Sequence, residues 1–481
     1  MTAETPNRIG GERQALGADT FERRNPADSR QVVSVATESS EADVRAAVDA
    51  AAGAAREWSR TTAVQRAALL EAAASALGAR VEEVATRLTE EEGKPLGDAR
   101  NEVGRAVRNL RLYAGEALRV EGHTFPSDEP GAIVRSEISP IGVVGVITPW
   151  NFPASLSTRK LGPALATGNT VVWKPSPMTP SVSDLIAEAF EEAGFPPGVF
   201  NIVQGFAAGA HLVADERVAG VTFTGSTRTG RAIHSALGLG RRAQLEMGGN
   251  NPVVVLADAD LEQAASIVAR SSFSVSGQAC TGAGRILVEA SVHDELVDRV
   301  AVLAGAYQLG NGMVEGVNTG PLVDEAALQT MQEVVAEAEG RGAKTVAGGQ
   351  RPTDEDLAHG WFFPPTLLVD VDPKSRLADQ EVFGPVVGVE RVGSLDEAIA
   401  RANDTEYGLT AAICTTSLSA VQQFTAEVQA GLVKVNRPTI GASFAAPFGG
   451  IKASGSGIFK EQLGPGVIEF YVQTRTVEVA R

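Results

Sequence analysis

One cysteine of this chain stands in a setting that suits a nucleophile. Cys280 lies in SGQACTG (276–282), with glycines on both sides and a predicted helix just before it. A lone cysteine is most often a small buried hydrophobic residue, but flanking glycines let a substrate and backbone N–H groups approach the sulfur. Because only the thiolate is a good nucleophile, such a site must lower the pKa of the thiol or supply a base.

A carboxylate that could be this base comes earlier in the chain. Glu246 ends an apolar strand in QLEMGGNNP (244–252), directly before two glycines. The plain interpretation is a solvated strand end or a salt bridge. The functional interpretation is a general base with a raised pKa. Cys280 and Glu246 together are more informative than either residue alone.

The segment FTGSTRTG (223–230) has features of a phosphate-binding turn. A predicted strand enters it, Gly225 and Gly230 lie five residues apart, and a predicted helix follows. Glycines at such a turn let the phosphates of a dinucleotide approach the N-terminus of the helix. The pattern is not GxGxxG, and a glycine turn between a strand and a helix is often only a turn.

Two polar residues follow other predicted strands. Lys174 ends the strand in TVVWKPSP, and Asn151 follows TPW at the end of another strand. Ligands of parallel sheets bind at the carboxyl ends of the strands, although Lys174 could also be an ordinary surface lysine. The amide of Asn151 could donate to an oxyanion or hold a turn.

Three later segments complete the candidates. QEVFGP puts Glu381 and Phe383 in a tight turn, NDTEYGL (403–409) is typical of a helix exit, and APFGGIKASG puts Phe448 beside glycines. Each could be loop structure alone. The five histidines lie outside these segments, which argues against Ser-His-Asp or Cys-His catalysis. No HxxxH or CxxC spacing occurs, so no metal site is expected.

Composition limits the class of protein. A chain of 481 residues exceeds one hydrophobic core, so two or three domains are expected. A net charge of −17 disfavours nucleic acid and anionic membranes as partners, and it is most simply explained by solubility. Two cysteines form no disulfide framework, the N-terminus lacks a signal-peptide h-region, and no stretch of about 18 apolar residues occurs. We therefore expect a cytoplasmic protein.

The elements that must position these residues follow from hydrophobic periodicity. Residues 39–118 predict helices, and residues 131–138 alternate like an exposed strand. From Pro140 onward strands and helices alternate, and a second alternating block runs from Asn251 to about Asn436. This alternation predicts parallel α/β sheets. With no low-complexity linker, the joint between domains is expected at 247–252.

Taken together, these segments resemble the aldehyde dehydrogenase superfamily over nearly the whole chain. The matching segments, in the order and at the spacings of the family, are TPWNFP, GNTVVWKP, FTGSTRTG, LEMGGNNPVVV, GQAC, EVFGPV, NDTEYGL and PFGGIKASG. The resemblance implies an α/β fold with a Rossmann-type cofactor domain, an α/β catalytic domain and a small β oligomerisation element. It implies an enzyme that oxidises a small-molecule aldehyde to a carboxylic acid with NAD or NADP.

The resemblance also assigns roles to residues. Cys280 would be the nucleophile, the Asn151 side chain and the Cys280 N–H would form the oxyanion hole, and Glu246 would activate water against the thioester. Glu246 favours hydrolysis over acyl transfer to CoA. The implied cofactor-binding residues are Lys174 (adenosine ribose), Ser176, Gly225, Ser226 and Gly230 (the last three at the pyrophosphate), Glu381 (nicotinamide ribose), Phe383 and Trp150. Trp150 would also border the substrate tunnel, where Arg159 and Phe448 are the implied substrate-binding residues; no metal is implied.

The sequence leaves the substrate and the cofactor open. Arg159 resembles the carboxylate-binding arginine of succinate-semialdehyde dehydrogenases, but the position of their second arginine holds Ser274. C-terminal segments such as VKVNRPTIG, KEQLG and EFY are more similar to α-ketoglutaric semialdehyde (2,5-dioxopentanoate) dehydrogenases, so that substrate ranks first, succinate semialdehyde second and aromatic aldehydes third. NAD-specific members often have a glutamate where this chain has Pro177, so NADP or dual use is expected as well. A non-catalytic relative and a thiol esterase are the rival classes.

The expected domains follow from the same resemblance. Residues 1–122 and 141–246 would form the NAD(P)-binding domain, and 247–450 the catalytic domain. Residues 123–140 and 464–481 would form oligomerisation strands, because unpaired strands are a liability unless another subunit covers them. A homodimer or a homotetramer is expected. The second cysteine, Cys414, lies in an apolar run and is predicted to be a buried structural thiol.

Overall fold

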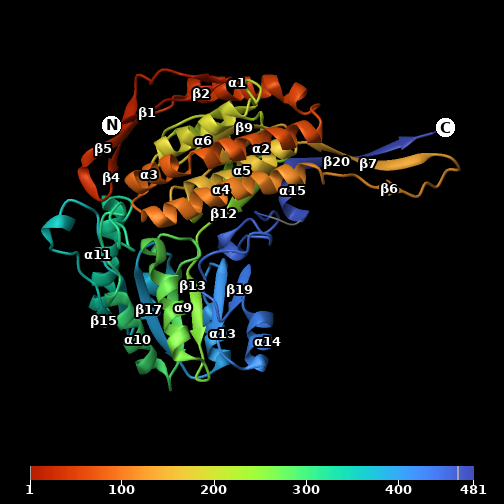
Figure 1. Ribbon diagram of the computed structural model, residues 1–481. Coiled ribbons are helices and arrows are strands. Elements are labelled where there is room, and N and C mark those ends of the chain that lie inside the picture. Colours follow the sequence, from red (N-terminus) through yellow and green to blue (C-terminus); the bar gives the residue numbers. More distant parts are fainter. Residues whose placement is uncertain (1, 463–464, 481) are drawn as a thin grey trace.

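The computed structural model describes residues 2–462 and 465–480, and two seven-stranded sheets dominate it (Figure 1). The first sheet has the order β12-β11-β8-β9-β10-β2-β3, and its strands are parallel from β12 to β10. All residues of its central strands are buried, as in a sheet covered on both faces. These five parallel strands are β8 (Val143–Ile147), β9 (Thr170–Lys174), β10 (Phe200–Ile202), β11 (Val218–Thr224) and β12 (Arg242–Glu246).

The predicted helical segment 39–118 is confirmed as four helices with clear start signals. Ser40 and Asp43 form a capping box at the first, and Thr62 and Gln65 form another at the second. The helices around the first sheet are α1 (Glu41–Trp58), α2 (Ala63–Ala79), α3 (Val81–Glu92), α4 (Leu96–Ala117), α5 (Pro153–Ala166), α6 (Pro180–Glu192), α7 (Ala208–Ala214) and α8 (Thr227–Ala236).

Helices α4 and α5 pack closely, and this contact fixes the segment that follows Asn151. Gly162 of α5 faces the ring of Tyr113 on α4, and a Cβ at Gly162 would lie 2.4 Å from that ring. Asn109 of α4 donates to the Ser155 carbonyl at 2.9 Å and to the Thr158 hydroxyl at 3.1 Å. A buried amide with two partners holds the two helices in one register.

The second sheet lies below the first in Figure 1 and has the order β15-β16-β17-β14-β13-β18-β19. Its strands are β13 (Asn251–Val255), β14 (Ala283–Glu289), β15 (Lys344–Ala347), β16 (Thr366–Val369), β17 (Val386–Val392), β18 (Thr410–Cys414) and β19 (Leu432–Val435). Its helices are α9 (Leu261–Phe273), α10 (His293–Gly305), α11 (Glu325–Gly340), α12 (Arg376–Asp379), α13 (Leu395–Asn403) and α14 (Leu418–Glu427). The chain crosses from one sheet to the other between β12 and β13, within the predicted joint 247–252.

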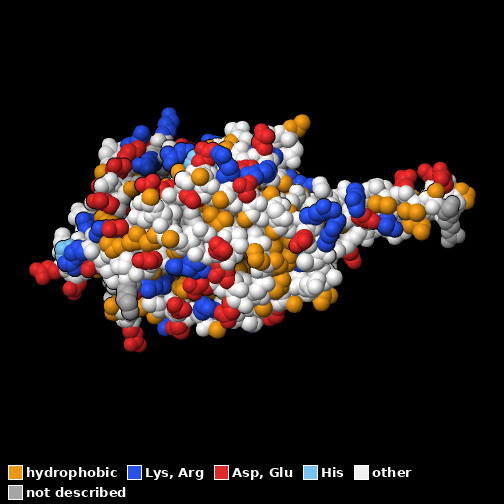
Figure 2. Space-filling model, turned by 90° about the horizontal axis from the view of Figure 1, so that it is seen from above, with side chains coloured by type: hydrophobic (Ala, Val, Ile, Leu, Met, Phe, Trp, Pro, Cys, Tyr) orange, Lys and Arg blue, Asp and Glu red, His pale blue; other side chains and the backbone are white. Residues whose placement is uncertain are grey.

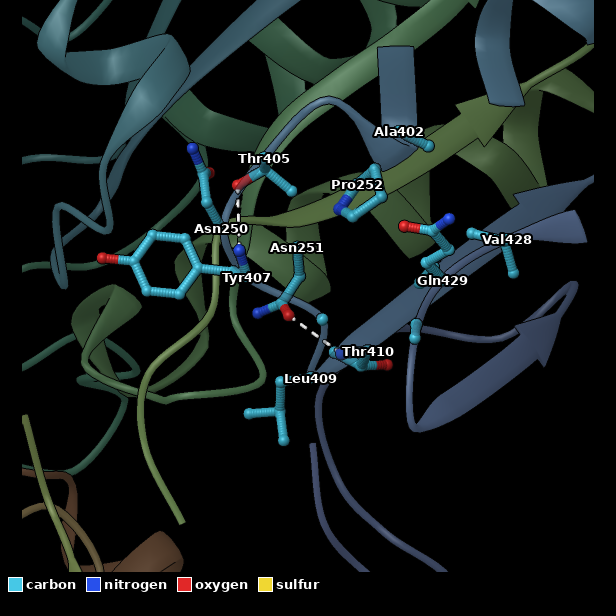
Figure 3. Close-up of a pocket in the computed structure, with 13 residues that line it drawn as sticks. Asn250, Asn251, Pro252, Ala402, Thr405, Tyr407, Leu409, Thr410, Val428 and Gln429 are labelled. Atoms are coloured by element: carbon cyan, nitrogen blue, oxygen red, sulfur yellow. Dashed lines mark hydrogen bonds between the residues drawn. The ribbon is translucent and has the colours of Figure 1, made fainter. Parts of the chain in front are cut away.

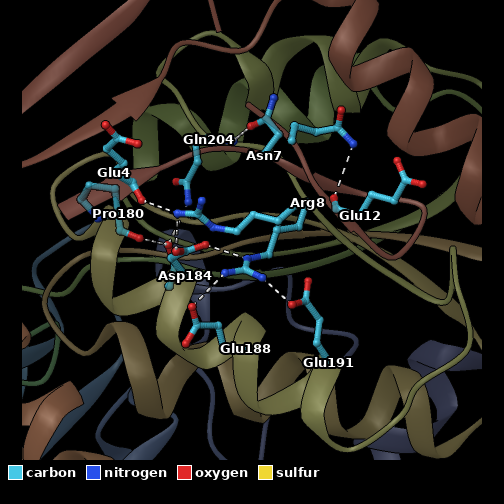
Figure 4. Close-up of polar contacts among 12 residues, drawn as sticks. Glu4, Asn7, Arg8, Glu12, Pro180, Asp184, Glu188, Glu191 and Gln204 are labelled. Atoms are coloured by element: carbon cyan, nitrogen blue, oxygen red, sulfur yellow. Dashed lines mark hydrogen bonds and ion pairs between the residues drawn. The ribbon is translucent and has the colours of Figure 1, made fainter. Parts of the chain in front are cut away.

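Residues 3–37 contain strands that the sequence pattern did not predict. A three-stranded sheet has the order β1-β5-β4, from β1 (Ala3–Thr5), β4 (Thr20–Asn25) and β5 (Asp28–Thr37), while β2 (Arg8–Ile9) and β3 (Glu12–Arg13) extend the first large sheet. Arg8 secures this edge through ion pairs with three carboxylates of α6 (Figure 4): Nε to Asp184 at 2.7 Å, and further contacts with Glu188 at 3.1 Å and with Glu191. Its guanidinium is buried, so paired charges compensate its desolvation.

Three strands extend away from the body as an antiparallel arm (Figure 1). They are β6 (Thr124–Phe125), β7 (Ile133–Pro140) and β20 (Val472–Val479). The expected strand from about residue 464 is wrong over its first part, because Pro465–Tyr471 form helix α15. Three apolar residues of this helix are buried in the core beneath the helices of the first sheet: Val467, Phe470 and Tyr471. A helix can turn all three toward the core, whereas a strand of the exposed arm cannot. Residues 464 and 481 of the predicted segment lie outside the described residues.

Within residues 2–462 and 465–480, no helix combines the length and the hydropathy that crossing a membrane requires.

Candidate active site

The loop that carries Cys280 is held in an unusual backbone conformation. After α9 comes a short turn, Ser274–Gly277, in which Val275 and Ser276 have φ of 55° and 53°. Gly277 also has positive φ, and a Cβ there would lie 2.1 Å from the carbonyl oxygen of Gly384. Only glycine therefore lets this loop pack against the turn that carries Glu381. Left-handed residues other than glycine persist where the surroundings hold them, as they often do at functional sites.

Asn251 ties the nucleophile loop to the second sheet. Its side-chain amide donates to the carbonyl oxygens of Cys280 at 2.8 Å and Gly282 at 2.7 Å. Its side-chain oxygen accepts from the N–H of Thr410 at 3.0 Å, the contact drawn in Figure 3. These two bonds fix the peptide planes that follow Cys280 and Gly282.

A cavity of about 270 Å³ opens in front of the Cys280 thiol. It runs from the thiol to the glycine turn after β11, and thus joins segments that lie far apart in the sequence. Seven of the residues predicted for the site line it: Trp150, Asn151, Gly225, Ser226, Cys280, Glu381 and Phe383. Lys174, Ser176, Gly230, Glu246, Arg159 and Phe448 are not among its lining residues.

Asn151 is held from both ends. Its carbonyl oxygen accepts from the ammonium group of Lys94 at 2.5 Å, and Lys94 also binds Glu102 at 2.6 Å. The side-chain Nδ2 of Asn151 donates to the carbonyl of Gln278 at 2.9 Å. Because an amide NH₂ carries two hydrogens, this bond orients the group beside Cys280 and leaves the second N–H for another acceptor.

Glu246 ends β12 as predicted and is buried. Its Oε2 accepts from the N–H of Gly450 at 3.2 Å, and a Cβ at Gly449 would lie 2.4 Å from its Oε1. Burial, and then the negative charge of Glu461, raise the pKa of Glu246 well above the usual value for glutamate, while Lys160 opposes the shift. A carboxylate with a raised pKa is a stronger base than an exposed one.

The thiol of Cys280 is surrounded by negative charge. Burial raises its pKa to about 12, and the carboxylates of Glu381, Glu246 and Glu461 act in the same direction. The positive charge of Arg159 acts against them. Without a ligand the thiol is therefore protonated at neutral pH, and its activation requires transfer of the proton to a base.

The residues on the other side of the cavity fit a dinucleotide. Gly225 faces the ring of Phe223 and Gly230 faces Met247, at distances that leave no room for a Cβ (2.6 Å and 2.2 Å). Ser226 caps the N-terminus of α8, where backbone N–H groups point outward. Ser176, just after β9, is buried and accepts from the N–H of Met178 at 3.2 Å.

Two of the residues predicted to bind the cofactor are ionisable. Lys174 is buried at the carboxyl end of β9, and no hydrogen bond from its ammonium group is found among the described residues; burial lowers its pKa to about 8. Glu381 accepts from the N–H of Gly249 at 3.1 Å, and desolvation raises its pKa to about 7. Phe383 meets Trp150 edge-to-face, with ring centroids 5.5 Å apart. Glu381, Phe383 and Trp150 line the cavity, and a carboxylate beside an aromatic wall suits a ribose and a flat ring.

Comparison with known proteins identifies the family. The model of the aldehyde dehydrogenase family matches residues 14–477. An α-ketoglutarate semialdehyde dehydrogenase of Haloferax volcanii is 40% identical over 99% of both chains. The chain belongs to the aldehyde dehydrogenase family.

Two further members show the breadth of the match. The NADP(+) succinate-semialdehyde dehydrogenase of Escherichia coli is 37% identical, covering 96% of this chain and 94% of that one. The solved structure of betaine aldehyde dehydrogenase from Staphylococcus aureus with NAD+ superposes with a TM-score of 0.95 at 32% identity, covering 98% of this chain and 94% of that chain. The predicted α/β fold and the predicted class, an NAD(P)-dependent aldehyde dehydrogenase, are confirmed.

In this aldehyde dehydrogenase, Arg159 and Phe448, the two residues predicted to bind substrate, contact each other. The guanidinium of Arg159 lies over the ring of Phe448, 5.5 Å from its centroid. Arg159 is buried, and its Nε has no hydrogen-bond partner among the described residues. Phe448 pairs with Glu461 by two backbone hydrogen bonds and directly precedes the two glycines that contact Glu246.

Sequence reasoning assigned no role to two buried ion pairs of the dehydrogenase. Lys160 contacts Glu461 and the hydroxyl of Thr222, at 3.0 Å, behind Glu246. Lys94 pairs with Glu102 beneath Asn151. Lys160 and Glu461 are 301 residues apart, whereas Lys94 and Glu102 are eight residues apart. In neither pair does the local sequence mark the two residues as buried. The only available signal was a lysine or glutamate beside a catalytic motif, as Lys160 stands beside Arg159.

Proposed function

We propose that this dehydrogenase oxidises α-ketoglutaric semialdehyde (2,5-dioxopentanoate) to the carboxylic acid with NAD or NADP, through a thioester on Cys280. The observation that carries the proposal is the one cavity that joins the Cys280 thiol to the glycine turn and Glu381. An aldehyde and a dinucleotide sharing that cavity meet at the sulfur. The name of the Haloferax volcanii relative supports the choice of substrate.

In the first step the sulfur of Cys280 adds to the aldehyde carbon while the thiol proton passes to solvent water in the cavity. The oxygen becomes an oxyanion, and the free N–H of the Asn151 amide and the backbone N–H of Cys280 donate to it. Lys94 and the Gln278 carbonyl keep Asn151 in position for this role. In a dry site each such donor contributes about 3–4 kcal/mol to the transition state.

The cofactor is held by residues of the first sheet and of the 381–385 turn. Lys174 would bind the adenosine ribose, Ser176 would be a further cofactor contact, Gly225, Ser226 and Gly230 would line the pyrophosphate, and Glu381 would bind the nicotinamide ribose. Phe383 and Trp150 form the aromatic wall beside the nicotinamide. When bound, NAD or NADP supplies the acceptor for the hydride that leaves the substrate carbon.

Glu246 completes the reaction by activating water. Its carboxylate removes a proton from a water molecule that attacks the thioester carbon, and the acid then leaves from Cys280. The raised pKa of Glu246 makes it a stronger base than an exposed carboxylate near neutral pH. Lys160 and Glu461 form a buried ion pair whose charges act on Glu246 in opposite directions: Glu461 raises its pKa and Lys160 lowers it.

Arg159 supports a substrate that carries a carboxylate. Its guanidinium is buried on the Phe448 side, with an Nε that lacks a partner among the described residues. A guanidinium fork fits a carboxylate in a bidentate way. Succinate semialdehyde is the second candidate, favoured by the name of the Escherichia coli relative and by Arg159, and disfavoured by Ser274 in place of a second arginine.

Dual use of NAD and NADP belongs to the same proposal. Pro177 carries no carboxylate that would repel a 2′-phosphate, and Lys174 nearby attracts one.

We also propose that the arm joins subunits into a homodimer or a homotetramer. Figure 2 shows apolar side chains along it, and Phe125, Ile133 and Val479 are 43–47% exposed. Strands with open edges and exposed apolar residues are covered by another chain in many proteins. The proposed domains outside the arm are a cofactor-binding domain, residues 1–122 and 141–246, and a catalytic domain, residues 247–450, which supplies the nucleophile.

The test is cofactor reduction followed at 340 nm. Purified protein is mixed with NAD or NADP and with 2,5-dioxopentanoate, succinate semialdehyde or benzaldehyde, and Cys280→Ala is the control. The proposal expects the highest kcat/KM with 2,5-dioxopentanoate and loss of all reduction in the variant. If kcat/KM is higher with succinate semialdehyde or benzaldehyde, that aldehyde and not 2,5-dioxopentanoate is the preferred substrate. Turnover that survives Cys280→Ala would refute the thioester on Cys280.

A further inference from the structure

Three arginines meet where α4 packs against α5. Arg105 and Arg108 lie on α4, and Arg159 lies on α5. Arg105 sits on the α4 face that touches α5, between Glu102, which accepts from the N–H of Ala154 at 2.9 Å, and Asn109. The three guanidinium groups are close enough that the charges of Arg159 and Arg108 both lower the pKa of Arg105, after the larger effect of burial.

None of these three arginines has an ion pair or a hydrogen bond within residues 2–462 and 465–480. Their neighbours on the same helix behave differently, since Arg100 pairs with Glu82 and Arg111 pairs with Glu71. Glu102 is the carboxylate on this helix whose charge acts on Arg105, but it is already bound to Lys94. Like charges that gather in a partly buried place without counter-charge are costly unless an anion joins them.

The cluster adjoins the substrate side of the nucleophile. Arg159 is near enough to lower the pKa of Cys280 by its charge. Two aromatic rings of one loop lie under the cluster: Phe448 under Arg159, at 5.5 Å, and Phe444 under Arg108, at 5.6 Å. Stacking on aromatic rings holds a guanidinium plane in place while leaving its N–H groups free to donate.

We propose that Arg105 and Arg108, together with Arg159, bind the carboxylate at the far end of the aldehyde substrate and so determine specificity for ω-oxo carboxylic acids. This proposal rests on the proposed function, which requires a carboxylate-bearing aldehyde. Arg105 and Arg108 supply from α4 the positive charge that Ser274 cannot supply. Because Arg108 is exposed, solvent screens its charge, and it contributes less than Arg105 to binding of the carboxylate.

The experiment compares two aldehydes of equal length, 5-oxopentanoate and pentanal. The measured quantity is the ratio of their kcat/KM values in the wild type, Arg105→Met, Arg108→Met and Arg105→Lys. Arg111→Met is the matched control, because Arg111 lies on the same helix but pairs with Glu71 at the surface. The ratio should fall about tenfold in Arg105→Met, through KM for 5-oxopentanoate, and about threefold in Arg108→Met, as expected for loss of charge-assisted hydrogen bonds.

The controls separate this proposal from the proposed function. Arg111→Met should keep the wild-type ratio within about twofold, and Arg105→Lys should recover part of it because the charge remains. A wild type that prefers 5-oxopentanoate while Arg105→Met keeps the same ratio would overturn the role of the cluster. A wild type without preference would overturn the carboxylate-bearing substrate itself.

A binding readout covers the case in which Arg105→Met turns over poorly. Glutarate, a dicarboxylate of similar length, should protect Cys280 from iodoacetamide in the wild type. The glutarate concentration that gives half-maximal protection should be about tenfold higher in Arg105→Met than in the wild type, and unchanged in Arg111→Met. Equal protection in all three proteins would contradict the assignment of Arg105.

Discussion

The two cysteines of this chain have the same direction of pKa shift for different reasons. Burial alone raises the pKa of Cys414 to about 12, since that thiol lies in the core of the second sheet at the end of β18. Cys280 reaches about the same value through burial and three carboxylates, in a half-buried loop beside a cavity. A shift caused by apolar packing is fixed by the fold. A shift caused by charges changes when those charges are neutralised. Of the two thiols, therefore, only Cys280 has a pKa that neighbouring groups can change.

The comparison is tested most severely by deleting each thiol. Cys280→Ala should lower kcat by at least about 10⁴-fold, because the covalent step loses its nucleophile. Cys414→Ser should keep turnover within about threefold. The measurement is steady-state reduction of NAD or NADP at 340 nm. A comparable loss in both variants would mean that the nucleophile has been assigned wrongly.

Glu246 should affect the second half of the reaction rather than the first. In Glu246→Gln the thioester should form and persist, so the first turnover remains and later turnovers slow by about 10²–10⁴-fold. Stopped-flow recording at 340 nm should show a burst of one reduced cofactor per site. If the burst is lost along with the steady state, Glu246 acts in the attack of the thiol and not in hydrolysis.

The carboxylate of Glu381 should restrain the thiol of Cys280. With a pKa of about 7, Glu381 is ionised at pH 8 and raises the pKa of Cys280. Glu381→Gln removes that charge, so the pKa of Cys280 falls, its thiolate fraction rises, and alkylation by iodoacetamide at pH 8 should accelerate several-fold. Near pH 5, where the carboxyl is neutral in the wild type, the two proteins should react alike. Equal rates at pH 8 would show that Glu381 does not act on the thiol; Cys414 should stay unmodified throughout.

The smallest expected effect concerns stability. Cys414→Ala leaves a small cavity in the second core, so its midpoint of thermal unfolding should fall by about 1–3 °C. Cys280→Ala lies in a loop beside a cavity and should change the midpoint by less. Differential scanning fluorimetry without ligand compares them. A larger loss in Cys280→Ala would show that its loop, and not β18, is the more tightly packed setting.

The sequence predicted what depends on short-range pattern. The four helices over 39–118, the strands that end at Lys174 and Glu246, and the crossing at 247–252 follow from periodicity, caps and glycines. Strands β1, β2 and β3 were missed because each has only two or three residues, and β5 was missed because its buried and exposed residues do not alternate regularly. Helix α15 was missed because its apolar residues fit either period. The buried partners Lys160 and Glu461 are 301 residues apart, so only the folded chain brings them together. Lys94 and Glu102 are eight residues apart, but their burial beneath Asn151 depends on the packing of α4 against the segment that carries Asn151.

The most direct test of the central claim is the mass of the trapped intermediate. Glu246→Gln is mixed with 2,5-dioxopentanoate and NAD or NADP, and the reaction is quenched in acid. The protein is then digested, and the mass of the peptide that contains Cys280 is measured by mass spectrometry. The account predicts that this peptide gains the mass of the acyl group while the peptide with Cys414 does not. An unmodified Cys280 peptide in a sample that has reduced one cofactor per site would contradict a thioester on Cys280.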